Sequence, residues 1–194
     1  MQNTAENIKP KATPKIYVAC LASYNQGMLH GDWIDLTDCK EFNDLQQKVD
    51  QIIKASKAFG AEEVAIHDYD NFLDLGEYPD FQKLFEVYQA INNSEIDNAI
   101  LYAHIERNFG VDYFLENPDQ ILQIEDSYVG DWQDFKEYAE HYAYEVDEFQ
   151  SIPEHMQHWF DWESYSQDLS YNHDCVDILD DNGYVEGVAI FYHY

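Results

Sequence analysis

The hydrophobic pattern of the first 70 residues switches between the period of strands and that of a helix. Three stretches are apolar or alternating, and polar turns such as Asn25-Gln26-Gly27 separate them. A fourth has apolar residues three or four positions apart, which predicts an amphipathic helix. We expect an N-terminal α+β module over 15–69, with strands at 15–24, 28–36 and 62–69 and a helix at 40–59 that starts near Asp38 and Glu41 and stops at Gly60.

Residues 70–117 show only the helical period, which predicts a central helical module. Pro79 stands near the first turn of one expected helix, and Ser94 with Asp97 can cap the next. Asn117-Pro118 marks the end of the module. The apolar stripes are Phe81, Leu84, Phe85, Tyr88 and Ile91 in the first helix, and Ile96, Ile100, Leu101 and Ile105 in the second.

Residues 118–194 mix both periods and predict a C-terminal α+β module. A second helix start stands at Ser151-Ile-Pro-Glu154, and Asp181-Asn182-Gly183 predicts a hairpin between strands near 175–180 and 185–193. The polar residues 1–14 predict a disordered tail. The fold class is therefore α+β. The first helix of this module is expected over 131–146, with the stripe Trp132, Phe135, Ala139, Tyr142 and Val146.

The segment 156–169 carries apolar residues on two opposite sides of one helical wheel. Either the helix breaks near Asp161, or it lies between two apolar surfaces, one of which can belong to a second subunit. The first cluster can cover the module's own sheet, which leaves the second exposed, and a two-fold contact would bury it. The first cluster is Met156, Trp159 and Phe160, and the second, the expected dimer interface, is Trp162, Tyr165 and Leu169.

The net negative charge of the chain lies entirely in residues 58–194. The net charge is −29, yet residues 1–57 hold seven Lys and seven acids and are neutral. Residues 58–194 hold 32 Asp or Glu against Lys83, Arg107 and Lys136. Self-repulsion of this size opposes compaction, and its usual benefit is a long-range field. The partner is therefore expected to be positively charged.

The acids themselves form the candidate site. A solvated surface is the plain alternative, and a halophilic surface is a second, although that would not spare residues 1–57. Asp131, Asp134, Glu137 and Glu140 stand three apart on the expected helix, where like charges destabilise by a few tenths of a kcal/mol each. The array comprises Asp68, Asp70, Asp74, Glu77, Asp80, Glu86, Asp112, Glu116, Asp119, Glu125, Asp126, Asp131, Asp134, Glu137, Glu140, Glu145, Asp147 and Glu148.

Other chemistries find little support in the sequence. The calcium-like start at Asp68 fails because Phe72 and Leu73 occupy a ligand and a glycine position. His155 and His158 have no third metal ligand nearby, and nucleophile elbows and phosphate-binding loops are absent. We expect no metal, no cofactor and no enzymatic activity, and the charge sign excludes direct binding of nucleic acid.

Composition also limits where the protein acts. The longest apolar run, 16–22, is too short to span a bilayer, and anionic lipid would repel the acids. Cys20, Cys39 and Cys175 are odd in number and widely spaced, so a disulfide framework is not expected. We expect a cytoplasmic protein with reduced thiols and no membrane contact.

Three ordered blocks of the sequence carry a family resemblance. They are residues 16–36 (IYVACLASYNQGMLHGDWIDL), 61–69 with Asp70 (AEEVAIHDYD), and 152–169 (IPEHMQHWFDWESYSQDL). In this order they resemble the opening strand-turn-strand, the acidic signature and the C-terminal antirestriction motif of the ArdA family of antirestriction proteins. The chain departs from the pattern in its polar N-terminal tail and its longer, acidic final hairpin. The motif positions are Pro153, Glu154, Phe160, Asp161, Trp162 and Glu163.

The resemblance implies an elongated, curved protein of three modules that dimerises through its C-terminal module. It implies a DNA mimic that occupies the DNA-binding groove of type I restriction-modification enzymes and protects incoming DNA of mobile genetic elements. A dimer would carry twice the chain's charge, which equals that of roughly 100 Å of B-DNA at about one charge per 1.7 Å of axis. The alternatives are an acidic chaperone or sequestering protein for basic DNA-binding proteins and, with less support, a calcium-dependent enzyme.

Overall fold

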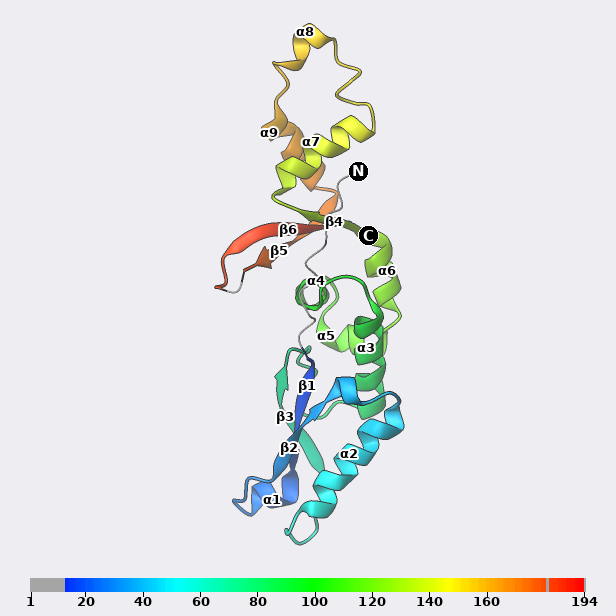
Figure 1. Ribbon diagram of the computed structural model, residues 1–194, viewed down its shortest axis with the longest axis vertical. Coiled ribbons are helices and arrows are strands. Elements are labelled where there is room, and N and C mark those ends of the chain that lie inside the picture. Colours follow the sequence, from blue (N-terminus) through cyan, green and yellow to red (C-terminus); the bar gives the residue numbers. More distant parts are fainter. Residues whose placement is uncertain (1–12, 181, 194) are drawn as a thin grey trace. The chain divides into compact units, whose positions relative to one another are not determined.

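The computed structural model describes residues 13–180 and 182–193 (Figure 1). The chain divides into two compact units, Met1–Asp119 and Gln120–Tyr194, called unit 1 and unit 2 below. Residues 1–12, most of the expected disordered tail, lie outside the described residues. Pro14, the last residue of that expected tail, is buried, and its carbonyl accepts a hydrogen bond from the Leu36 N–H at 3.0 Å.

Unit 1 begins with an antiparallel three-stranded sheet of order β2-β1-β3. The inward side chains of β1, Ile16, Val18 and Cys20, are fully buried, as its apolar pattern predicts. The expected strand 15–24 is too long, because at Cys20 the chain turns into the short helix α1, where the hydroxyls of Ser23 and Ser56 lie 2.7 Å apart. The elements are β1 Lys15–Cys20, α1 Leu21–Asn25, β2 Gly31–Asp35 and β3 Val64–Asp70.

Helix α2 (Phe42–Ala55) packs against β1 and β2 through the buried Leu45 and Val49. Its start differs from the expected one, because Asp38 lies in the preceding 3-10 turn η1 (Leu36–Asp38) and the capping box joins Glu41 to Asp44. Its end also differs. The helix stops at Ala55, before the expected Gly60, because Ser56 adopts an extended conformation and its side chain bonds to Ser23 and to the Ala58 N–H.

Three helices complete unit 1 and confirm the helical character of the expected central module. Asp80 caps α3 by accepting hydrogen bonds from the N–H groups of Gln82 and Lys83, and Asp97 caps α4. The helices pack onto the first part of the unit, with the rings of Phe42 and Phe85 6.5 Å apart. The division of unit 1 at residue 70 stays a prediction. The helices are α3 Phe81–Asn93, α4 Asn98–Asn108 and α5 Val111–Glu116.

Unit 2 contains a second antiparallel sheet, of order β4-β6-β5. The expectation of a helix over 131–146 is wrong at its start, because Asp131 and Trp132 pair with Ala189 and Val188 and so belong to β4. The helix that follows begins at Phe135. The elements are α6 Gln120–Ser127, β4 Tyr128–Trp132, α7 Phe135–Glu145, α8 Glu154–Gln157, α9 Trp162–Ser170, β5 His173–Leu179 and β6 Val185–Tyr192.

A buried polar pair joins α7, α9 and β5. Tyr138 donates its hydroxyl proton to Nε2 of His173 at 2.9 Å, and Nδ1 of His173 donates to the Leu169 carbonyl at 2.9 Å. Both hydrogen bonds fit a neutral imidazole protonated at Nδ1. Burial raises the pKa of Tyr138 above its usual value, and Tyr192 adds to that effect. This pair is satisfied inside an apolar core that includes Val188 and Ile190.

The ambiguous segment 156–169 does break at Asp161. α8 is a single turn, and α9 starts afresh with Asp161 as its N-cap. The expected final hairpin is also present: the Asp180 N–H donates to Tyr184 O at 2.8 Å, while Gly183 adopts φ +82°, which a residue with a side chain rarely takes. Asp181 of this turn lies outside the described residues. The two mixed units confirm the α+β class.

Candidate functional site: an exposed array of carboxylates

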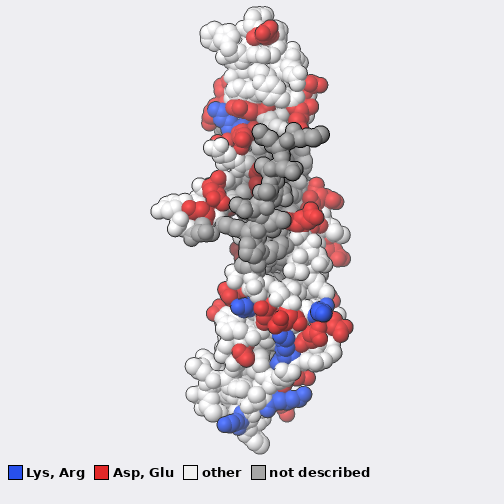
Figure 2. Space-filling view, in the orientation of Figure 1, with Lys and Arg blue, Asp and Glu red and all other residues white. Residues whose placement is uncertain are grey.

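The eighteen predicted acids all reach the surface of the described structure. Sixteen are exposed, and Glu125 and Glu140 are half-buried. They come from both units: the strand β3, the loop after it, the helices α3 and α5, and the segment from Asp119 to Glu148. Figure 2 shows acidic side chains on the visible face of both units. Charged residues rarely bury without a partner, so this exposure is what their chemistry requires.

Several of these carboxylates are held in place by the backbone of their own segment. Asp134 caps α7 by accepting from the Glu137 N–H at 2.8 Å, and Glu137 in turn accepts from the Gln133 N–H at 2.9 Å. Asp68 accepts from the Tyr69 N–H at 2.9 Å. Each such carboxylate keeps further lone pairs for an outside cation, and its position is fixed before any partner arrives.

The expected row of four acids on one helix is wrong. Asp131 lies on β4, where it accepts from the Tyr128 hydroxyl at 2.6 Å, and Asp134 precedes the first turn of α7. Only Glu137 and Glu140 stand on the helix itself. The repulsion expected along a helix face is therefore relieved, because a strand and a cap carry half of the row.

Few cations neutralise the array from within. Among the described residues, Lys83 pairs with Glu116, and His141 lies 3.6 Å from Glu145. The third ion pair, Lys48–Asp38 at 3.2 Å, belongs to the neutral first part of unit 1. Exposed pairs of this kind contribute about 0–1 kcal/mol, so they barely reduce the outward negative field.

The six antirestriction-motif positions line the connection between α7 and α9. Pro153 precedes α8, Glu154 is the first residue of α8, and both are exposed, as is Glu163 in the first turn of α9. Phe160 and Trp162 pack around Phe149, with ring centroids 5.4 Å and 4.9 Å away. These contacts give the aromatic positions of the motif a packing role.

Asp161 lies between α8 and α9 and caps the N-terminus of α9. It accepts from Ser164 twice, from the hydroxyl at 2.7 Å and from the N–H at 3.1 Å. These hydrogen bonds hold the pKa of Asp161 below its usual value. A lowered pKa means that the charged carboxylate favours the folded cap, so its contribution is present at neutral pH and is lost as pH falls through that lowered pKa.

We expect Asp161→Ala to lower the melting temperature of the protein and to loosen the turn between α8 and α9. Asp161→Asn should largely preserve both, because asparagine is an equally good N-cap. Thermal unfolding followed by circular dichroism, together with limited proteolysis of the 150–162 region, measures this. Equal melting temperatures for Asp161→Ala and the unsubstituted protein would show that the cap does not hold the turn.

The structure places the two apolar clusters of 156–169 differently from the expected arrangement. Leu169 packs against the core of unit 2, and the Tyr165 hydroxyl donates to Glu148 at 2.8 Å. Met156 and Trp159, expected to face the sheet, are 51% and 79% exposed. Trp162, Tyr165 and Leu169 are each half-buried. Their part in a dimer interface stays a prediction, but the most exposed apolar surface here is Met156 with Trp159.

Neither a metal site nor a membrane-spanning helix is found among the described residues. The described residues contain no group of three or more His, Cys, Asp or Glu that could hold a metal ion, and His155 and His158 have no third ligand there. Across residues 13–180 and 182–193, no helix is both long and apolar enough to cross a bilayer.

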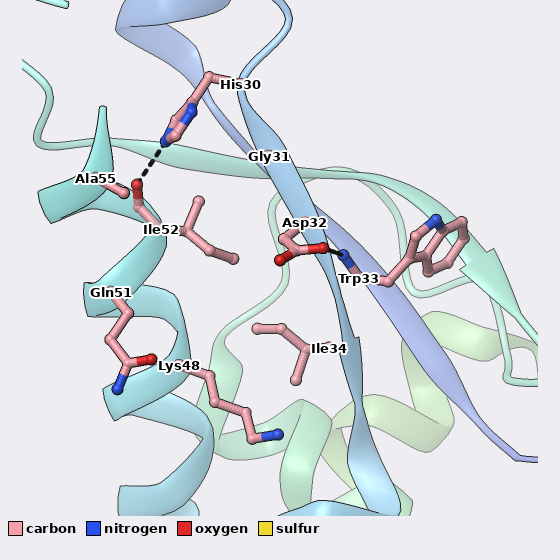
Figure 3. A pocket seen from close by; sticks show the side chains of 9 residues that line it. All are labelled: His30, Gly31, Asp32, Trp33, Ile34, Lys48, Gln51, Ile52 and Ala55. Carbon is pink, nitrogen blue, oxygen red and sulfur yellow. Dashed lines mark hydrogen bonds between the residues drawn. The ribbon is translucent and has the colours of Figure 1, made fainter. Parts of the chain in front are cut away.

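A shallow hollow of about 390 Å³ lies between β2 and α2 (Figure 3).

The fold and the array define a class: a small, strongly acidic α+β protein whose ionisable groups are spread over its outer surface. The family model described as "Antirestriction protein (ArdA)" matches residues 16–186, which include all three blocks of the sequence resemblance. The chain belongs to the ArdA family of antirestriction proteins. A comparison with curated proteins finds no match.

Proposed function

We propose that this protein is a DNA mimic that occupies the DNA-binding groove of type I restriction-modification enzymes and inhibits them. The observation that carries the proposal is the exposed array of eighteen acids, of which few form ion pairs with other described residues. On this proposal it acts in the cytoplasm without catalysis or cofactor, and it protects incoming DNA of mobile genetic elements.

The mechanism is a replacement of phosphates by carboxylates. Lysine and arginine side chains that line the enzyme's groove would pair with the array and exclude DNA. Carboxylates already fixed by caps, such as Asp80 and Asp134, lose little freedom on binding, which favours association. Release of the cations that surround the free array adds to affinity, as it does for DNA.

We also propose that the active form is a homodimer joined through unit 2. A dimer doubles the number of carboxylates offered to one groove. The half-buried Trp162, Tyr165 and Leu169, with the exposed Met156 and Trp159, are the apolar residues available for that contact.

Competition with DNA tests the proposal directly. A type I methyltransferase is titrated with the protein in the presence of labelled duplexes that do or do not contain its recognition sequence. The proposal requires displacement of both duplexes with the same inhibition constant. A protein that merely sequesters basic proteins would bind histone-like proteins equally well, and that result would favour the chaperone alternative.

We expect the affinity for the methyltransferase to fall steeply as salt rises. Exposed charges are screened beyond about 8–10 Å at physiological ionic strength, and cation release gives a linear dependence of log affinity on log salt. Titration calorimetry from low to moderate salt measures the slope. A flat dependence would remove the electrostatic basis of the proposal, since apolar contacts would then dominate.

A further inference from the structure

Two segments of unit 1 lack acids altogether. Residues 21–31 and 51–61 contain no Asp or Glu, and their only Lys or Arg residues are Lys54 and Lys57. In a chain of net charge −29 this is a marked exception. Such a surface cannot bind a basic DNA groove in the way that the carboxylate array would.

Hydrogen bonds join these two segments at one end of unit 1. The Ser23 and Ser56 hydroxyls lie 2.7 Å apart, and Gln26 Nε2 donates to the Phe59 carbonyl at 3.4 Å. Nε2 of His30 donates to the Ile52 carbonyl at 2.7 Å. The segments 21–31 and 51–61 therefore form one surface, which we name the acid-free tip.

The acid-free tip exposes large apolar side chains. Leu29 is 90% exposed, Phe59 is 95% exposed and Tyr24 is 54% exposed. Single exposed apolar residues are ordinary, but a group of them on turns that are bonded together is typical of an interaction site. The hollow between β2 and α2 adjoins the tip, because His30, Ile52 and Ala55 of the tip line it (Figure 3). Its other lining residues include Ile34, Lys48 and one acid, Asp32.

One N–H group on the sheet edge beside the tip is already satisfied by a side chain. The N–H of Trp33 on the edge strand β2 is already bonded to Asp32 Oδ1 at 2.9 Å (Figure 3). A side chain that satisfies an edge N–H opposes the addition of another strand. The tip is therefore suited to contact through protruding side chains and the hollow.

We propose that the acid-free tip docks on an apolar surface of the restriction-modification enzyme that lies outside its basic DNA-binding groove and has carboxylates at its rim. This inference rests on the proposed function and adds a second contact to it. Leu29 and Phe59 would enter an apolar pocket, while Lys54 and Lys57 face the acidic rim. Such anchors at the centre of a contact often carry much of its binding energy. They would also distinguish this enzyme from other basic proteins.

The test compares two double variants of the full chain. Leu29→Ala/Phe59→Ala removes the apolar anchors, and Tyr184→Ala/Val185→Ala removes two apolar residues of 74% and 62% exposure in the final hairpin, outside the array and the tip. Affinity for a type I methyltransferase is measured across a salt series. We expect the tip variant to bind roughly tenfold or more weakly at every salt concentration, with an unchanged salt slope. The control should match the unsubstituted protein. Because all four side chains are exposed, melting temperatures should not change.

The outcomes separate this inference from the proposed function. Steep salt dependence with no loss of affinity in the tip variant would overturn the docking surface and leave the mimic intact. A tip variant that changes only the oligomeric state, measured by sedimentation, would show that the occupant is a second copy of this chain and would also overturn it. Unsubstituted protein that does not displace DNA would refute both.

Discussion

Neutralising acids of the array in groups should weaken inhibition progressively, whereas neutralising any single acid should change it by less than about fivefold. Each exposed pair contributes about 0–1 kcal/mol. Six pairs at a mean of about 0.5 kcal/mol give about 3 kcal/mol, or roughly a hundredfold in inhibition constant. The single-site case to test is Asp134→Asn, which also keeps the cap of α7.

The six-fold variant uses acids that receive no hydrogen bond from the other described residues, so that the fold is not disturbed. Asp147 adopts φ +58°, a conformation that asparagine accepts readily. The substitutions are to Asn or Gln at Asp112, Asp119, Asp126, Glu140, Glu145 and Asp147.

A matched control separates the location of charge from its amount. Asp112→Asn/Asp119→Asn/Asp126→Asn and Asp35→Asn/Asp38→Asn/Asp50→Asn each remove three negative charges. The first set lies in the array and the second outside it. Both leave the same net charge, so a difference between them reports the location of the acids, and we expect only the first to weaken inhibition. Equal effects would indicate a general polyanion, and abolition by one acid-to-amide change in a folded protein would indicate a discrete site.

The elements that the sequence predicts well are those whose pattern is local. Helix α3 follows from its own apolar stripe, with Pro79 near its start, and the burial of Leu84, Phe85 and Ile91 confirms it. The exposure of the acids was equally predictable, because ionised side chains seldom leave water. In both cases the determining physics lies within a few neighbouring residues.

The errors arose where distant residues decide the structure. Trp132 fits the spacing of a helical stripe, yet its backbone pairs with Val188 some 56 positions away, and that pairing makes β4. Leu169 was expected to be exposed because nothing nearby in the sequence shows that it packs beside Tyr138 and Ile190. Periodicity gives the faces of a helix but does not say which face meets the core.

The structure shows, by contrast, where the neutral part of the chain lies on the surface. The sequence shows only that residues 1–57 are neutral. The hydrogen bonds from Ser23 to Ser56 and from Gln26 to Phe59 bring two acid-free segments together on one surface. A neutral stretch of sequence thereby becomes a localised patch with exposed apolar side chains.

Substitution of the exposed apolar residues near α8 should convert the homodimer that we propose into a monomer. Met156 and Trp159 protrude from a segment, 150–160, in which Glu154 is the only acid. A two-fold contact there would bury apolar surface while keeping most carboxylates of the two chains apart. We expect Trp159→Asp to give a monomer at micromolar concentration, and Tyr165→Lys to weaken the dimer through its half-exposed ring.

A comparison of Leu169→Asp with Trp159→Asp distinguishes loss of the dimer contact from loss of core packing. Because Leu169 packs on the core of unit 2, Leu169→Asp should lower the melting temperature as well as dissociate the dimer. The loss of stability should be about 2 kcal/mol, the low end for a core leucine, because Leu169 is half-buried. Trp159→Asp should dissociate the dimer with the melting temperature of the monomer unchanged. The monomer should retain partial inhibition, since each chain still carries its own array.

Salt provides the final check on this assembly. The net charge of each chain opposes association, so raising salt should strengthen the dimer while it weakens binding to the methyltransferase. Sedimentation of the unsubstituted protein, Trp159→Asp, Tyr165→Lys and Leu169→Asp across a salt series measures both stoichiometry and trend. An unsubstituted chain that stays monomeric at micromolar concentration in moderate salt would refute the dimer. A dimer indifferent to both Trp159→Asp and Tyr165→Lys would place its interface on another surface, because neither apolar cluster of 156–169 would then contribute to it.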